Sequence, residues 1–316
     1  MSLIPERIFH DIEKKNLSLK QGVYLLKSFI ENSRDPKLRL SGLKYLKRLN
    51  IKNKSIYSLL ENLLISDMDE RVRVYAADFL SSKYIQKAIS PISWAIQYEK
   101  NYFCEISLIK SLARINNTKA KQILVKQIQE ICSKDYIDTQ DLYHNFGFIK
   151  SIKNAYDFHW NKIPTGDIAD ILINFKTISN LIQEFYYVFF EWEKGRVISL
   201  DLSELGWNVS RTWEFIDASK IRDLKEIPGI FNLKNLRVLD LSNNHLKSIK
   251  ELLKFPYLTH LYLKNNNLED PENLTYVKEM KKLEYIDIRG NKIANYINKS
   301  EFSNLNLILK DYLVFM

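Results

Sequence analysis

The stretch "LRVLDLSNNHLKSI", residues 236–249, places an asparagine in a row of leucines. Leucines stand at positions 236, 239, 241 and 246, and the spacing of Asn244 puts it in the same row. A buried side-chain amide is costly unless it is hydrogen-bonded. The stretch therefore indicates a structure in which an amide has partners inside an apolar core.

The same pattern recurs twice downstream, at offsets of 22 and then 25 residues. "LTHLYLKNNNL" and "LEYIDIRGNKI" repeat it with Leu258, Leu261, Leu263, Asn266 and Leu268, and with Leu283, Ile286, Ile288, Asn291 and Ile293. This resembles the leucine-rich repeat family, with the signature L-x-x-L-x-L-x-x-N-x-L, and is similar to its SDS22-like class. The resemblance implies one short parallel strand per turn, with the turns stacked into a curved solenoid.

The asparagines have an architectural role in this interpretation. Asn carries donors and an acceptor, so Asn244, Asn266 and Asn291 are expected to satisfy backbone groups of neighbouring turns. The alternative is that they are ordinary exposed turn residues.

The pattern extends less regularly in both directions. "VISLDLSELGW" fits from Val197, but Leu205 stands where the asparagine should be. "SRTWEFIDA" suggests a short helix, and "IRDLKEIPGIFNLKNL" the second half of an irregular turn. Another turn starts at Leu305, and we read residues 312–316 as a cap over the last turn, with a dimer contact or disorder as alternatives.

From about residue 4 to 194 the apolar residues recur at helical spacing, without convincing alternation. Asp, Ser, Asn or Thr precedes many of the apolar runs, which is helix N-cap chemistry. We expect about ten helices, a long one running from Asp167 to Lys194 with Gly195 as its C-terminal cap.

These helices also repeat, at offsets of 34 and 32 residues. The copies are "DPKLRLSGLKYL", "DERVRVYAADFL" and "NYFCEISLIKSL". This resembles the HEAT-repeat family, whose first helix often reads D-x-x-x-V-R-x-x-A-A-x-x-L. The third copy departs from it, with Glu105 in place of Arg and large residues in place of the small pair. The alternative is an unrelated helical bundle.

The predicted fold class is therefore α+β in two parts. An all-α HEAT-like helical solenoid, residues 1–194, precedes a short α/β leucine-rich repeat solenoid with a parallel sheet, residues 195–316.

The net charge of +9 lies entirely in the helical part. Residues 1–150 carry 25 Lys or Arg against 16 Asp or Glu, whereas residues 151–316 carry 22 of each. A dense basic group could meet an anionic partner such as nucleic acid; its members are Lys37, Lys44, Lys47 and Arg48. A solvated lysine-rich helix surface is the interpretation we prefer.

No sequence motif for catalysis, a metal or a cofactor is present. Phosphate-binding glycine loops, a G-x-S-x-G elbow and Cys/His metal spacings are all missing from the sequence. The cluster of Asp157, His159 and Trp160 could line a site, but packed rings at a helix end are the interpretation we prefer. Trp94 would suit the cleft of a HEAT-like DNA glycosylase, but is expected to pack between repeats. We predict no enzyme, no metal and no cofactor.

The compartment follows from cysteines and targeting signals. There are two cysteines, and Cys104 is expected to be a packed free thiol. Without a signal-peptide pattern or a disulfide framework, we expect a cytoplasmic monomer with no membrane span.

Function is then expected to depend on the surface of the leucine-rich part. Side chains alternate along a strand, so the positions between the buried ones face outward. The predicted protein-binding residues on this concave face are Asp240, His260, Tyr262, Lys264, Tyr285, Asp287 and Arg289. The rings could instead merely shield the sheet. The family resemblance implies a protein partner such as a small GTPase or a phosphatase, for a non-catalytic adaptor. The alternative is a nucleic-acid binder that uses the basic helical face, or an enzyme site built within residues 136–194.

Overall fold

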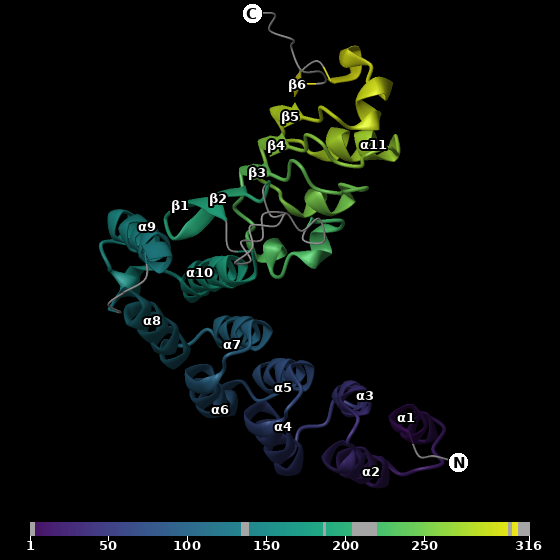
Figure 1. Ribbon diagram of the computed structural model, residues 1–316. Helices are drawn as coiled ribbons and strands as arrows, with labels where there is room; N and C mark the ends of the chain where they lie inside the picture. The colour runs from purple at the N-terminus through teal and green to yellow at the C-terminus, as the bar shows by residue number, and fades with distance from the viewer. Residues whose placement is uncertain (1–3, 134–138, 186–187, 204–219, 303–304, 309–316) are drawn as a thin grey trace, which may run out of the picture. The chain divides into compact units, whose positions relative to one another are not determined.

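The computed structural model describes residues 4–133, 139–185, 188–203, 220–302 and 305–308. Helices fill the first part of the chain and a six-stranded sheet forms in the second (Figure 1). The described helices are α1 (Pro5–Glu13), α2 (Leu19–Asn32), α3 (Pro36–Arg48), α4 (Lys54–Ser66), α5 (Glu70–Lys83), α6 (Ile85–Tyr98), α7 (Tyr102–Ile115), α8 (Thr118–Cys132), α9 (Thr139–Tyr156), α10 (Thr165–Phe185) and α11 (Glu272–Glu279). The strands are β1 (Phe189–Glu193), β2 (Arg196–Asp201), β3 (Val238–Asp240), β4 (His260–Tyr262), β5 (Tyr285–Asp287) and β6 (Asn306–Ile308).

The chain divides into two compact units. The first contains Met1–Glu130 and Trp160–Ala169, and the second contains Ile131–His159 and Asp170–Met316. We call them the helical unit and the strand unit.

Several helix starts in the helical unit have a polar N-cap side chain, as the sequence predicts. The Asp35 carboxylate accepts from Lys37 N–H at 2.8 Å, and Asp69 accepts from Arg71 N–H at 3.0 Å. Asn101 does the same for Cys104 N–H at 3.2 Å. Each cap satisfies a backbone donor that the first helical turn leaves without an intrahelical partner.

Two arginines at equivalent places in successive copies of the helical repeat form the same contacts. Arg39 in α3 makes a bidentate pair with Asp67 at the end of α4, at 2.7 and 2.9 Å. Arg73 in α5 makes the same pair with Glu99 at the end of α6, at 2.9 and 3.0 Å. Each guanidinium also donates to carbonyl oxygens of the loop before its own helix. Glu105 occupies the third position, so the pair is not repeated there.

Small residues in the repeat copies allow neighbouring helices to approach closely. A Cβ at Gly42 would lie 2.7 Å from Ile30 Cγ1, so α2 and α3 could not approach as closely with a larger residue there. Between α5 and α7, Ser111 Oγ donates to Ala77 O at 3.4 Å. Neighbouring helices therefore approach closely at these positions, and a core of Leu, Ile, Val and Phe lies between the helices.

The expected long helix from Asp167 to Lys194 is wrong at its C-terminal end. Helix α10 ends at Phe185, and Phe189–Glu193 is strand β1, paired antiparallel with β2. Lys194 and Gly195 have φ values of 52° and 71° and form the hairpin turn, so Gly195 is no helix cap. The predicted division at residue 194 falls in this turn.

The strand unit is built as the leucine spacing predicts. Its strands lie in the order β1-β2-β3-β4-β5-β6, parallel from β2 onward, with Leu239, Leu261 and Ile286 in register and fully buried. The stretch after Lys220 adds two short 3-10 helices, Leu224–Glu226 and Ile230–Asn232, to the same core. Leu305 does begin a further turn with β6, whereas Leu205, Trp207, "SRTWEFIDA" and residues 312–316 lie outside the described residues.

The asparagine ladder confirms the predicted role of the amides. Asn244 Nδ2 donates to Leu202 O in the preceding turn at 3.1 Å, and Asn244 Oδ1 accepts from Ile221 N–H at 2.9 Å. Asn266 and Asn291 repeat this pattern one and two turns later. All three side chains are buried, so their role is to pair backbone groups inside the core.

Candidate protein-binding face of the strand sheet

Three aromatic side chains lie together on the outward face of β4 and β5. The His260 and Tyr285 rings stack with centroids 5.7 Å apart and planes 19° apart. The Tyr262 ring lies 5.0 Å from that of Tyr285, tilted by 45°. We call these three residues the aromatic cluster.

Strand register explains why the rings meet. His260 pairs with Tyr285, and Tyr262 pairs with Asp287, across adjacent parallel strands. Residues in register on one face lie about 5 Å apart, which brings side chains of this size into contact. The rings are half-buried, and each strand is anchored from behind by a fully buried residue.

The carboxylates on this face have a structural role in the turns after the strands. Asp240 Oδ1 accepts from Ser242 N–H at 2.8 Å, and Asp287 Oδ1 accepts from Arg289 N–H at 3.1 Å. Asp201 does the same at the end of β2. Each short polar side chain thus closes the turn that follows its strand. In β4 the position in register with Asp240 and Asp287 holds Tyr262 in place of a carboxylate, and this tyrosine belongs to the aromatic cluster.

Burial and charge distinguish the two acids beside the rings. Asp287 is only 3% exposed and holds Arg289 in a bidentate pair at 2.6 and 2.9 Å. Burial, together with the nearby carboxylates of Asp201 and Asp287, raises the pKa of Asp240, although hydrogen bonds from Ser242 oppose the shift. Burial, and then the negative charge of Asp287, also raises the pKa of Tyr285. The predicted binding residues therefore sit on adjacent strands, with Lys264 and Arg289 beyond the strand ends, but Asp287 presents almost no free surface.

Residues 217–268 match a family model for leucine rich repeats. The match includes β3, β4 and the turns that hold Asn244 and Asn266. No curated protein and no solved structure matches the chain. The strand unit thus contains a leucine-rich repeat region, a kind of domain that in general binds other proteins.

The basic residues predicted for an anionic partner divide into two groups. Lys37, Lys44 and Arg48 are exposed and recur at helical spacing along one face of α3. Lys47 points elsewhere, since its Nζ lies 2.5 Å from an Asp78 carboxylate oxygen. Part of the predicted charge is therefore neutralised within the protein, and an anionic partner here stays a prediction.

The polar cluster after α9 offers no evident site. Asp157 and His159 are exposed, 3.7 Å apart, and Trp160 is buried. Across the described part of the chain, no group of three His, Cys, Asp or Glu side chains is placed to hold a metal ion. The same residues include no helix long and apolar enough to cross a membrane.

Trp94 was placed wrongly by sequence reasoning. Its side chain does not pack between repeats; it is 46% exposed and lies against Tyr98, with ring centroids 4.8 Å apart. The signal was present in α6, where Ala88, Ile92 and Ala95 form the buried face and leave Trp94 off it.

Proposed function

We propose that this protein is a non-catalytic scaffold that binds another protein through the aromatic cluster of His260, Tyr262 and Tyr285. The observation that carries the proposal is that the three rings contact one another on an outward sheet face. Tyr side chains bring large contact area and a polar handle, which is why they are enriched where binding energy concentrates.

The cluster is also preorganised. Its rings project from parallel strands whose partners are fixed in register, and Thr259 Oγ1 lies 3.0 Å from His260 Nδ1. A surface that is already ordered loses little conformational entropy when a partner binds. Arg289, held in place by Asp287, adds a fixed guanidinium group at the edge of the cluster.

Further features of the proposal rest on resemblance. Equivalent Arg39–Asp67 and Arg73–Glu99 pairs support a HEAT-like reading of the helical unit, and the repeat lengths support an SDS22-like class for the strand unit. We further propose a cytoplasmic monomer whose partner belongs to the small GTPases or the phosphatases.

The test is a pull-down from native cell extract with three baits. They are the wild type, Tyr262→Ala/Tyr285→Ala, and the matched control Tyr257→Ala/Tyr296→Ala, which removes two tyrosines that are 47% and 61% exposed. Each bait is used at low salt and at about 0.3 M salt, with and without nuclease, because phosphate contacts weaken steeply with salt.

A protein retained at both salt concentrations by the wild type and the control, and lost from the cluster variant, supports the proposal. Equal retention by the cluster variant overturns it. Capture of nucleic acid alone, abolished by nuclease, would indicate that the protein binds nucleic acid through the basic helical surface.

A further inference from the structure

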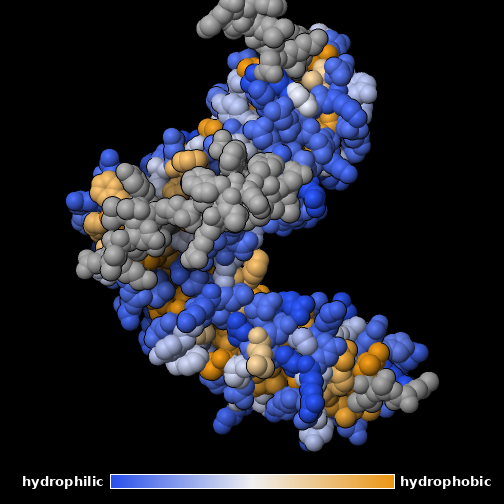
Figure 2. All heavy atoms as spheres, viewed as in Figure 1, coloured by the Kyte–Doolittle hydropathy of each residue, from blue (hydrophilic) through white to orange (hydrophobic). Residues whose placement is uncertain are grey.

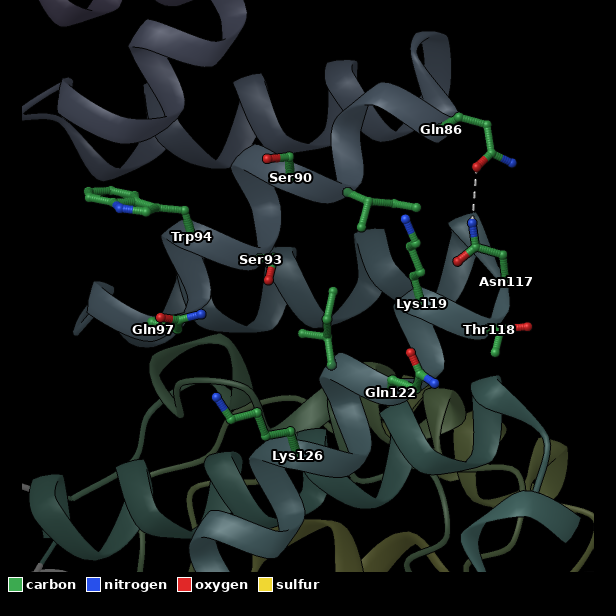
Figure 3. Close-up of a pocket in the computed structure, with 12 residues that line it drawn as sticks. Gln86, Ser90, Ser93, Trp94, Gln97, Asn117, Thr118, Lys119, Gln122 and Lys126 are labelled. Atoms are coloured by element: carbon green, nitrogen blue, oxygen red, sulfur yellow. Dashed lines mark hydrogen bonds between the residues drawn. The ribbon is translucent and has the colours of Figure 1, made fainter.

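A groove lies between α6 and α8 of the helical unit (Figure 3). Its volume is about 900 Å³, and α6 and α8 contribute side chains from opposite sides. We call it the α6–α8 groove. Its lining residues are Gln86, Ile89, Ser90, Ser93, Trp94, Gln97, Asn117, Thr118, Lys119, Gln122, Ile123 and Lys126.

The lining combines apolar surface with two lysine side chains. Ile89, Trp94 and Ile123 are the apolar members, and apolar residues reach the surface of this unit among mainly hydrophilic ones (Figure 2). Lys119 and Lys126 are exposed, and Lys119 extends towards α6 in Figure 3. No carboxylate belongs to the lining.

The amides in the groove can pair with an extended chain. Asn117 Nδ2 donates to Gln86 Oε1 at 3.2 Å, which joins the two sides at one end. Gln97 and Gln122 are exposed and carry both donors and an acceptor. Lys126 lies 3.7 Å from Glu130 on its own helix, but both are exposed, and such pairs contribute little.

A second groove of about 830 Å³ shares Gln86 with the first. It lies where α4 and α6 begin and adds three more lysines, again with no carboxylate in its lining. The full lining is Lys52, Asn53, Lys54, Tyr57, Tyr84, Ile85, Gln86 and Lys87. The adjoining grooves therefore present five lysines together with aromatic and aliphatic side chains.

We propose that these adjoining grooves bind an acidic segment of a partner protein, with a bulky apolar side chain of that segment against Trp94 and Ile123. Charge complementarity selects an acidic partner. All charged side chains of the two linings are lysines, which attract acidic segments and repel basic ones. The Trp94 ring can stack on a base as well as on an apolar side chain, but Ile89 and Ile123 in the same lining gain only from burying an apolar side chain, which favours a protein.

The experiment begins with random peptides of about a dozen residues displayed on phage and panned against the full-length chain, a length that spans roughly 40 Å when extended. Bound phage are eluted with soluble wild-type protein, and the enriched peptides are kept whatever their affinity for the variants. A fluorescein-labelled peptide of the enriched sequence then gives affinities by anisotropy.

Three variants are compared with the wild type. Trp94→Ala/Lys119→Glu is expected to weaken peptide binding about tenfold or more, as for loss of a central aromatic contact with an opposed charge. Its matched control, Tyr24→Ala/Lys20→Glu, removes a 71% exposed ring and an exposed lysine from α2 and is expected to leave affinity unchanged. Tyr262→Ala/Tyr285→Ala is expected to have no effect, which separates this site from the aromatic cluster.

Enriched peptides that are acidic, contain a bulky apolar residue and lose affinity only in the groove variant support the inference. Neutral or basic peptides, absence of any enrichment, or equal loss in the α2 control overturn it. So does a fluorescein-labelled single-stranded oligonucleotide that binds in a Lys119-dependent way while no peptide does.

Discussion

Replacing Asn266 with alanine tests whether buried amides hold the leucine-rich turns together. Asn266 is 5% exposed. Its Oδ1 accepts from Leu246 N–H at 3.0 Å, and its Nδ2 donates to the carbonyl oxygens of Leu241 and Leu263 at 2.9 and 3.0 Å. One side chain thus links two successive turns.

The magnitude follows from which groups lose every partner. The two carbonyl oxygens each keep a second donor, the amide of Asn244 at 3.1 Å for one and that of Asn291 at 2.8 Å for the other. Leu246 N–H keeps no side-chain acceptor, and a buried orphaned donor costs about 1–3 kcal/mol. With the two lost hydrogen bonds included, we expect Asn266→Ala to lower the free energy of unfolding of this unit by about 2–4 kcal/mol.

Hydrogen exchange followed by mass spectrometry measures this loss of stability in the affected turns, because amides exchange through openings of their own segment. Peptides that cover residues 258–268 should exchange about thirtyfold faster or more, since about 1.4 kcal/mol corresponds to a factor of ten. The control is Asn267→Ala, which truncates the exposed neighbouring asparagine. If both variants exchange alike, the ladder does not stabilise the turns and the reasoning fails.

Three further outcomes are expected. Gly290→Ala should destabilise the strand unit by about 1–2 kcal/mol or more, because φ is +72° and the new Cβ would lie 2.2 Å from Asn265 Oδ1; Gly166→Ala, with nothing within 4 Å, is the control in thermal unfolding. Because burial raises the folded-state pKa of Asp240, its contribution to stability is present at low pH and lost as pH rises through that pKa. Asp240→Asn should therefore match or exceed wild-type stability at neutral pH in urea unfolding and lose this relative advantage in acid; a large loss at neutral pH would contradict it. Burial raises the pKa of Cys104 to about 12, so this thiol should react with Ellman's reagent only after unfolding, and fast labelling of the native protein would show otherwise.

The repeat spacing, with the family resemblance that it carries, was enough to predict the parallel strands from β2 onward. Leu239, Leu261 and Ile286 lie between outward residues at a fixed period, and burial of each requires one strand per turn in a common register. The same period placed His260 opposite Tyr285. Asn244 could be assigned to the core because a buried amide costs little free energy only when it is hydrogen-bonded, and backbone groups are the available partners.

Other features could not be predicted because they depend on groups distant in sequence. The pairing of Arg39 with Asp67 and of Arg73 with Glu99 requires helices to stack before the charges meet. Strand β1 was misread as helix, because five residues carry too weak a periodicity to outweigh the helical pattern before them. Only pairing with β2 across the Lys194–Gly195 turn decides it.

The sequence by itself determined which residues share the core of each turn, because burial of apolar side chains follows local periodicity. Tertiary structure alone decided which surface groups remain available. Asp287 is buried and paired with Arg289, and the charge of Lys47 is neutralised by Asp78. Trp94 remains exposed at the rim of the α6–α8 groove. The physical reason is that charge pairing and side-chain exposure depend on neighbours brought together through space, whereas the core pattern is repeated along the chain.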